Sequence, residues 1–174
     1  MAFARETPTG FAPLPGETGG LANYGMMYPR AVIVAKGAGP VERRLWLPAD
    51  PALLEIARKM APGVSLKQCV APGQCLAKAP KLVIGGHGVS GPVFVDNAAF
   101  RQYVFATYQA RVLDMESAAV AQVAYVNDTP LIAFRSLSDL AGGDPGLNQF
   151  PVFMKLASEN SAAVVRSFLQ ALPD

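Results

Sequence analysis

Two carboxylates lie where the predicted elements change within residues 111–143. Glu116 falls where an apolar run gives way to Ala-rich helical spacing, and Asp139 falls just past a second apolar run at residues 131–134. Because ligands bind beyond the carboxyl ends of the strands in open α/β sheets, we expect both acids to face one crevice. One carboxyl group there could donate a proton while the other balances positive charge. The pattern therefore predicts a site.

Each acid also has a purely structural interpretation. Asp114 and Glu116 could simply be acids in the first turn of a helix, where the helix dipole favours negative charge. Ser138 or Asp139 could cap a helix that follows. The strand that ends before Glu116, the helix after it and the strand that ends before Asp139 have the length of a parallel crossover unit, which favours a shared site.

The composition indicates a packed domain. The chain has 174 residues, of which 51% are hydrophobic and 16% are charged, so a sizeable buried core is expected. Its 15 basic and 13 acidic residues leave a net charge of +2 and are scattered along the chain. This distribution predicts neither a nucleic-acid nor a membrane partner. We also expect no signal peptide and no membrane-spanning helix.

Apolar periodicity predicts alternating strands and helices around these acids. Strands are expected at residues 31–35, 81–84, 93–95, 111–115 and 131–134. Helices are expected from residue 51 to 62 after Asp50, from 98 to 107 after Asp96 and Asn97, after Glu116, and from 150 to 172. Residues 1–30 are rich in Pro and Gly and are expected to form a partly ordered arm.

The two cysteines do not match a metal or redox motif. Cys69 and Cys75 flank the turn-forming residues VAPGQ, which is not C-x-x-C spacing, and His87 is the only histidine. A structural zinc site is therefore not expected. The pair could form a local disulfide in an oxidising compartment or remain as two thiols, and we favour the disulfide.

A glycine-rich turn follows the strand expected at residues 81–84. Its sequence, GGHGVSG at residues 85–91, lacks the spacing of a dinucleotide or phosphate-binding loop. We interpret His87 as a loop residue and not as a ligand contact. Phe94 has two interpretations, because an aromatic ring beside a glycine turn could stack on a planar base or pack in the core.

Three segments, DMESAA at residues 114–119, RSLSD at residues 135–139 and SGPVFV at residues 90–95, resemble motifs of one enzyme family, the purine nucleoside phosphorylase and methylthioadenosine/S-adenosylhomocysteine nucleosidase superfamily. Residues 114–119 (DMESAA) resemble its MExAA motif, and residues 135–139 (RSLSD) resemble its R-x-x-SD motif. Residues 90–95 (SGPVFV) resemble its SGDxF segment, with Pro92 in place of the Asp. The resemblance runs from about residue 20 to the end of the chain and implies a three-layer α/β/α sandwich.

The resemblance also implies a role for each motif residue in cleaving an N-glycosidic bond. Phe94 would stack on the purine and Val95 would lend backbone contacts. Met115 and Glu116 would hold the ribose. Asp139, oriented by Ser138, would donate a proton to the departing base, and Arg135 belongs to the same substrate-binding motif. This bond breaks with positive charge on the sugar and negative charge on the base, so a carboxylate and a carboxyl acid suit it.

The resemblance covers only the C-terminal part of such an enzyme. The water-activating or phosphate-binding residues belong to the first half of that family, so we expect residues 31–174 to be an incomplete domain without its N-terminal part. Hydrolase and phosphorylase therefore stay open, as does a non-catalytic nucleoside-binding or storage protein on the same fold. The expected ligand is a small-molecule nucleoside, without a cofactor or metal. The family and the exposed sheet edges predict a homo-oligomer. The location would be periplasmic or secreted if a longer protein carries a signal peptide, and cytoplasmic otherwise.

Overall fold

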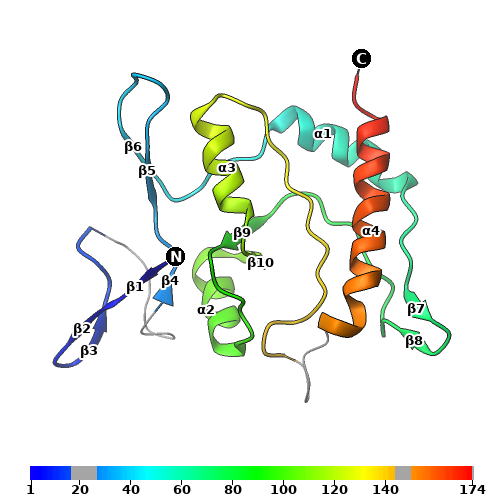
Figure 1. Ribbon diagram of the computed structural model, residues 1–174, viewed down its shortest axis with the longest axis horizontal. Coiled ribbons are helices and arrows are strands. Elements are labelled where there is room, and N and C mark those ends of the chain that lie inside the picture. Colours follow the sequence, from blue (N-terminus) through cyan, green and yellow to red (C-terminus); the bar gives the residue numbers. More distant parts are fainter. Residues whose placement is uncertain (17–26, 144–149, 174) are drawn as a thin grey trace. The chain divides into compact units, whose positions relative to one another are not determined.

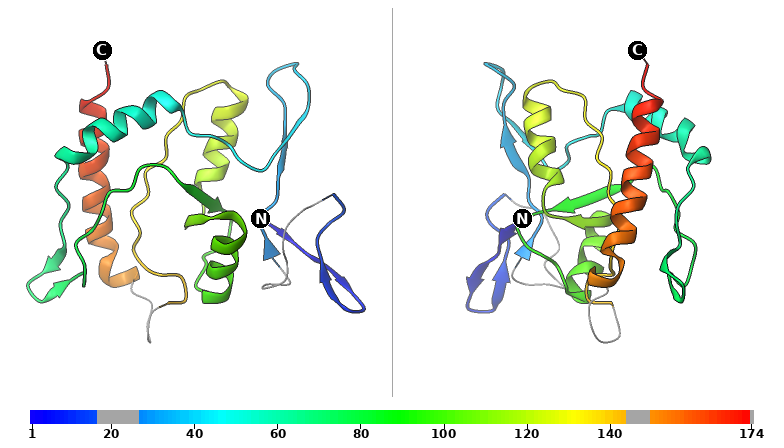
Figure 2. Two further views of the ribbon diagram at one scale, coloured as in Figure 1. Left: turned by 180° about the vertical axis from the view of Figure 1, so that it is seen from behind. Right: turned by 45° about the vertical axis from the view of Figure 1, so that its right-hand side comes forward.

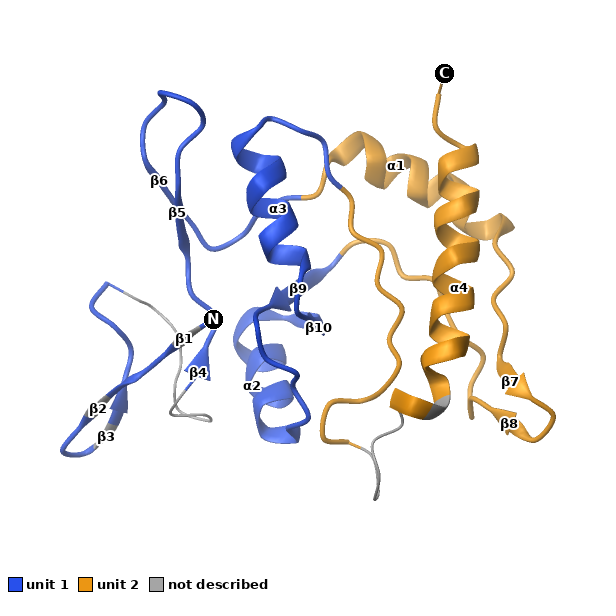
Figure 3. Ribbon diagram, viewed as in Figure 1, with its two compact units in different colours: residues 1–48, 86–131 blue, residues 49–85, 132–174 orange. Residues whose placement is uncertain are grey.

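The computed structural model describes residues 1–16, 27–143 and 150–173 (Figure 1). The chain forms two compact units (Figure 3). Unit 1 comprises residues 1–48 and 86–131, and unit 2 comprises residues 49–85 and 132–174. Both units contain helices and short strands, so the fold is mixed α/β. The division of the sequence at residue 30 stays a prediction.

The described residues of unit 1 form four strand pairs. The antiparallel pairs are β1 (Ala2–Phe3) with β4 (Met27–Tyr28), β2 (Arg5–Thr7) with β3 (Gly10–Ala12), and β5 (Val32–Val34) with β6 (Glu42–Arg44). The fourth pair is parallel and joins β9 (His87–Ser90) to β10 (Ala110–Asp114). The strand predicted at residues 31–35 is confirmed as β5.

The parallel pair is connected by a helix, α2 (Ala98–Tyr108), in a strand, helix, strand order. Asn97 caps α2 by accepting a hydrogen bond from the Phe100 amide at 2.8 Å, as its position before the apolar periodicity predicts. Gln109 ends the helix in the left-handed conformation, with φ of 53°. The next helix, α3 (Ser117–Val126), packs against β9. The helix predicted after Glu116 is therefore confirmed.

The core of unit 1 lies between α2 and the parallel strands. Its buried residues are Tyr28, Val89, Phe100, Tyr103, Val104, Tyr108 and Ala110. Tyr103 is fully buried, and its hydroxyl lies 3.5 Å from that of Tyr108. Burial raises the pKa of Tyr103, so this phenol stays neutral as a core group. The core thus fixes β9 and β10 from the side of α2.

Unit 2 is built around two helices, α1 (Pro51–Met60) and α4 (Phe150–Gln170), which pack against each other (Figure 2). Asp50 caps α1 by accepting hydrogen bonds from the amides of Ala52 and Leu53 at 2.9 and 3.0 Å. A 3₁₀ turn, η1 (Ala61–Gly63), follows α1. Both predicted helices are confirmed.

A hairpin of β7 (Cys69–Ala71) and β8 (Gln74–Cys75) packs through β7 on α4. The structure joins Cys69 and Cys75 by a disulfide. Beside it, the buried side chain of Asn160 on α4 accepts from the Lys67 amide at 2.8 Å and donates to the Lys67 carbonyl at 2.9 Å. The buried amide is therefore paired on both sides.

Three predicted strands are wrong. Residues 81–84, 93–95 and 131–134 have no strand structure, and a strand forms instead, as β9, within the segment 85–91 for which the sequence predicts a glycine-rich turn. Apolar character alone does not make a strand, because its backbone groups must also find a partner strand. Val83, for example, is 60% exposed. The described residues form only two-stranded sheets, so the three-layer sandwich stays a prediction.

Candidate functional site

The carboxyl ends of β9 and β10 lie side by side in unit 1. Val89 pairs with Leu113 and Ser90 pairs with Asp114. One residue further on, the Gly91 amide donates to the Asp114 carbonyl at 3.0 Å. The segment that contains Phe94 and the segment that contains Glu116 therefore leave the two strands at the same end, which is where ligands bind in open α/β sheets.

Phe94 and its neighbour Val95 differ in burial. Phe94 is 55% exposed, whereas Val95 is half-buried and packs against the core of unit 1. An aromatic ring that remains exposed beyond a strand end is not an ordinary core residue, so that interpretation of Phe94 is wrong. Stacking on a base stays the prediction for this ring.

The two acids that precede α3 also differ in what they do. The Asp114 carboxylate accepts hydrogen bonds from the amides of Glu116 and Ser117, at 3.3 and 3.0 Å. It thereby provides acceptors for amides at the start of α3, which have no hydrogen-bond partner within the helix. Glu116 occupies the N-cap position of α3 but its side chain makes no capping bond there. The side chains of Glu116 and Met115 are exposed. Asp114 therefore has a structural role at the start of α3, whereas the Glu116 side chain makes no such bond there.

The third motif lies in unit 2, in an extended segment that runs along α4. Phe134 anchors it by packing edge-on against Phe168, with ring centroids 5.0 Å apart. Further along, the Ser138 hydroxyl donates to the Asp139 carboxylate at 2.8 Å, and both residues are half-buried. No helix begins in the described residues that directly follow Asp139, so the capping interpretation of this pair is wrong.

The predicted site residues are thus divided between the two units. Unit 1 holds Phe94, Val95, Met115 and Glu116, and unit 2 holds Arg135, Ser138 and Asp139. In unit 1, the pairing of Ser90 with Asp114 places the first two motif segments at the same strand ends, and unit 2 contains the third motif. The catalytic and binding roles of all seven stay predictions.

His87 lies at the opposite end of β9 from Phe94. Its Nδ1 is 3.0 Å from the Tyr108 carbonyl, and a carbonyl only accepts, so this nitrogen carries a proton. The ring also lies against Trp46, with centroids 4.4 Å apart. His87 is the first residue of β9 and not the loop residue that the sequence predicts, and these contacts give it a structural role within unit 1.

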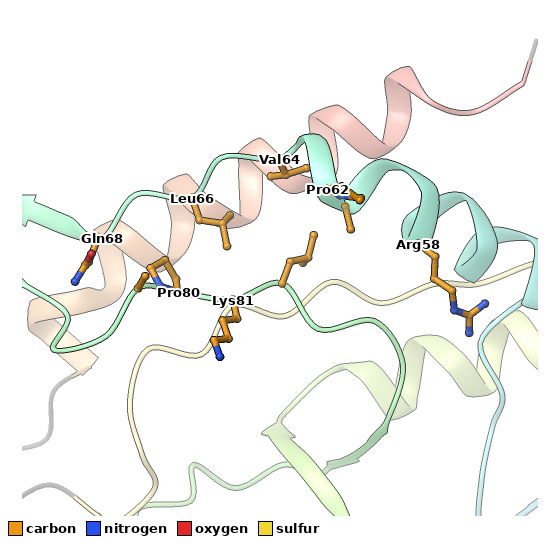
Figure 4. Close-up of a pocket in the computed structure, with 10 residues that line it drawn as sticks. Arg58, Pro62, Val64, Leu66, Gln68, Pro80 and Lys81 are labelled. Carbon is orange, nitrogen blue, oxygen red and sulfur yellow. The ribbon is translucent and has the colours of Figure 1, made fainter.

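A shallow pocket of about 520 Å³ opens on unit 2 (Figure 4). Its walls come from the end of α1, the turn η1 and residues 79–82. The lining is mainly apolar, and it includes two cations, Arg58 and Lys81. None of the predicted site residues lines this pocket.

One set of contacts has no signal in the sequence. Tyr125, at the end of α3, contacts Glu42 and Arg44 of β6, and these residues lie more than 80 positions apart along the chain.

Within the described residues, no group of three or more His, Cys, Asp or Glu side chains could hold a metal ion. The same residues contain no helix that is long and apolar enough to cross a membrane.

Comparison with known proteins gives relatives of two kinds. The chain is 25% identical to bark storage protein A of Populus deltoides over 128 residues, which are 74% of this chain and 40% of that protein. It is 28% identical to a 5'-methylthioadenosine/S-adenosylhomocysteine nucleosidase of Mycobacterium tuberculosis over 134 residues, 77% of this chain and 50% of the enzyme. It is 34% identical to the nucleosidase of that name from a Marinomonas species over 99 residues, 56% of this chain and 39% of the enzyme.

The alignments span half or less of the length of these relatives. No solved structure matches the chain. The sequence profile of the phosphorylase superfamily matches residues 10–170, which is most of the chain and includes all three motifs. The chain therefore belongs to the phosphorylase superfamily.

Proposed function

We propose that this chain provides the base and ribose contacts of a protein that cleaves the N-glycosidic bond of purine nucleosides. The observation that carries the proposal is the shared exit of two motif segments from β9 and β10, fixed by the bond from Gly91 to Asp114. It leaves Phe94 and Glu116 exposed beyond the same strand ends. An aromatic face and a carboxylate are the groups that a purine ring and ribose hydroxyls require.

In the proposed reaction, the bond between the anomeric carbon of ribose and the purine nitrogen breaks, and its electron pair leaves with the base. Asp139 donates a proton to the base, and the hydroxyl of Ser138 holds the Asp139 carboxyl in place. Glu116 accepts hydrogen bonds from the ribose hydroxyls and stabilises positive charge on the sugar. Proton donation of this kind contributes about 10²–10⁴-fold to rate.

Water or phosphate could attack the sugar, and the motifs described here do not include the residues that would activate either. The names of the Mycobacterium and Marinomonas relatives make methylthioadenosine the first substrate to test. Hydrolysis and phosphorolysis are then distinguished by whether base release requires phosphate.

The test combines calorimetric binding of adenine and methylthioadenosine with a base-release assay on the same sample. Glu116→Gln is expected to weaken methylthioadenosine binding and leave adenine binding unchanged, because adenine has no ribose. If the chain releases base, Asp139→Asn should remove most of that release without weakening binding to the same degree. Glu55→Gln is the matched control, because Glu55 is an exposed acid on α1 outside the motifs. Failure of the unaltered chain to bind either ligand would contradict the proposal.

A second candidate is a non-catalytic storage or nucleoside-binding protein. The similarity to bark storage protein A over 74% of this chain favours it. Nucleoside binding without base release, at any phosphate concentration, would support this candidate for the 174-residue chain.

We also propose that the chain associates with further copies of itself. The exposed apolar residues Val120 and Val123 on α3, which are 54% and 63% exposed, support this proposal. Analytical ultracentrifugation tests it, and a monomer at all concentrations would contradict it.

A further inference from the structure

The helix that begins at Glu116 is held only weakly by packing. Of the ten residues of α3, Ala124 alone is buried, and the face that carries Val120 and Val123 is exposed. The position of α3 must therefore depend strongly on the contacts at its ends. At the N-terminal end, the Asp114 carboxylate binds the amides of Glu116 and Ser117.

At the C-terminal end, α3 is bound to the hairpin of β5 and β6. The Tyr125 hydroxyl lies 3.1 Å from both oxygens of the Glu42 carboxylate and donates to it. Nε of Arg44 donates to the same carboxylate at 2.8 Å, and a second guanidinium nitrogen does so as well. Both residues of this ion pair belong to β6, so the pair holds the acceptor for Tyr125 in place.

Two cations lie against the ring of Tyr125. Nζ of Lys36 is 4.4 Å from the ring centroid, and Cζ of Arg44 is 4.6 Å from it, both within the range of cation–π attraction. Lys36 also forms an ion pair with Asp128, just beyond the end of α3. A cation at this position is favoured by the negative end of the helix dipole. The last turn of α3 is thus held by the hydroxyl of Tyr125, by the ring of Tyr125 and by the ion pair of Asp128.

The cluster around Tyr125 consists of two ion pairs, Glu42 with Arg44 and Lys36 with Asp128, in which each partner stabilises the charge of the other. Hydrogen bonds from Arg44 and Tyr125 hold the pKa of Glu42 below its usual value. The hydrogen bond from Lys36 to Asp128 raises the pKa of Lys36, although this ion pair is exposed to solvent. Both groups are therefore charged at neutral pH. Figure 2 shows the β5–β6 hairpin alongside α3 in unit 1.

We propose that the β5–β6 hairpin positions Glu116 by holding the far end of α3, which makes Glu42 and Tyr125 positioning residues for the ribose contact. This inference rests on the proposed function, in which Glu116 holds the ribose. A helix of ten residues is a stiff rod about 15 Å long. A shift or tilt at Tyr125 therefore reaches the turn that presents Glu116. Small misplacements of a binding group are costly, since about 1 Å can change rates 10²-fold.

The experiment compares Glu42→Gln and Tyr125→Phe with the unaltered 174-residue chain, Glu116→Gln and the control Glu55→Gln. Glu55 is a matched control because it also forms an ion pair with an arginine, Arg58, but on α1 of unit 2. The affinities for methylthioadenosine and for adenine are measured by calorimetry. Hydrogen exchange of the α3 amides is measured on the same samples.

We expect both variants to weaken methylthioadenosine binding about tenfold and to leave adenine binding within about twofold, because adenine does not contact Glu116. The α3 amides should exchange faster in both variants than in the unaltered chain, and their exchange rate should be unchanged in Glu55→Gln. An equal loss of affinity for methylthioadenosine and for adenine would show a general loss of structure and would overturn the inference. So would unchanged α3 exchange.

The failure of this inference is distinguishable from failure of the proposed function. If Glu116→Gln loses the ribose-dependent affinity while Glu42→Gln and Tyr125→Phe retain it, the positioning role is wrong and the proposed function stands. If the unaltered chain binds neither ligand, or if Glu116→Gln binds methylthioadenosine as well as the unaltered chain does, the proposed function fails and the positioning role fails with it.

Discussion

The Gly91 amide donates a hydrogen bond to the Asp114 carbonyl at 3.0 Å, one residue beyond the last strand pair of β9 and β10. This bond continues the parallel ladder to the point where both motif segments begin. Gly91 is buried, and a Cβ atom at this position would lie 2.4 Å from Cε of Met1. Any larger residue would require Met1 to move, so glycine allows this close approach.

Asp114 and Glu116 should respond differently to substitution. Asp114→Ala removes the carboxylate that accepts the amides of Glu116 and Ser117, and we expect a loss of about 1 kcal/mol in the free energy of unfolding. Asp114→Asn should recover most of this loss, because asparagine caps equally well. Glu116→Gln, at an exposed position, should change stability by less than about 0.5 kcal/mol. Urea denaturation measures all three, and a larger loss for Glu116→Gln than for Asp114→Ala would contradict the assignment of the cap.

Phe94 and Val95 form a second contrasting pair. Val95→Ala removes atoms that pack on the core of unit 1, so stability should fall by about 1 kcal/mol. Phe94→Ala should destabilise less, because this ring is 55% exposed, but it should weaken adenine binding about tenfold through loss of stacking. Thermal unfolding and calorimetry on the same variants test both expectations. Unchanged adenine affinity in Phe94→Ala would remove Phe94 from the proposed site.

The helices could be predicted from the sequence because their signals are local. Asp50 and Asn97 stand directly before the helices that they cap, and each bonds to amides within three residues. The strands could not be placed as well, because a strand requires a partner that the local sequence does not reveal. Residues 81–84 have the stronger apolar run, yet the parallel partner of β10 is β9, at His87–Ser90.

The motifs of the candidate site could be located from the sequence, but the part played by each residue could not. Asp114 and Glu116 are both acids at the start of α3, and only the hydrogen bonds of the structure distinguish the cap from the other acid. The contact of Tyr125 with Glu42 could not be predicted at all, because it joins residues 83 positions apart and neither belongs to a motif.

The disulfide should stabilise the β7–β8 hairpin by a modest amount. Cys69 and Cys75 are six positions apart, and closing so short a loop in the unfolded chain contributes about 2 kcal/mol. Reduction with dithiothreitol, or replacement of both cysteines by serine, should therefore lower the free energy of unfolding by that amount or less. The Lys67 contacts of Asn160 should persist, because they lie outside the closed loop. Faster hydrogen exchange of the α4 amides after reduction, which would mean that α4 unfolds, would contradict this local role of the disulfide.

The stability supplied by Glu42 should depend on pH on the acid side. Hydrogen bonds from Arg44 and then from Tyr125 lower the pKa of Glu42 from its usual 4.5 in the folded chain. A lowered folded pKa means that the unfolded chain binds the proton more readily, so the contribution is complete above pH 4.5 and is lost as the pH falls through the folded pKa. Glu159, whose pKa is lowered by Lys67, should behave in the same sense.

Thermal unfolding of the unaltered chain and of Glu42→Gln, measured from neutral to acid pH, tests this dependence. The difference in Tm should be constant at neutral pH and should shrink below pH 4.5, because a protonated Glu42 resembles glutamine in charge. High salt should reduce the difference at neutral pH, since the cluster is only half-buried and solvent ions screen its charges. A difference that grows as the pH falls would mean that Glu42 is stabilised in its protonated form, which the donors Arg44 and Tyr125 do not allow.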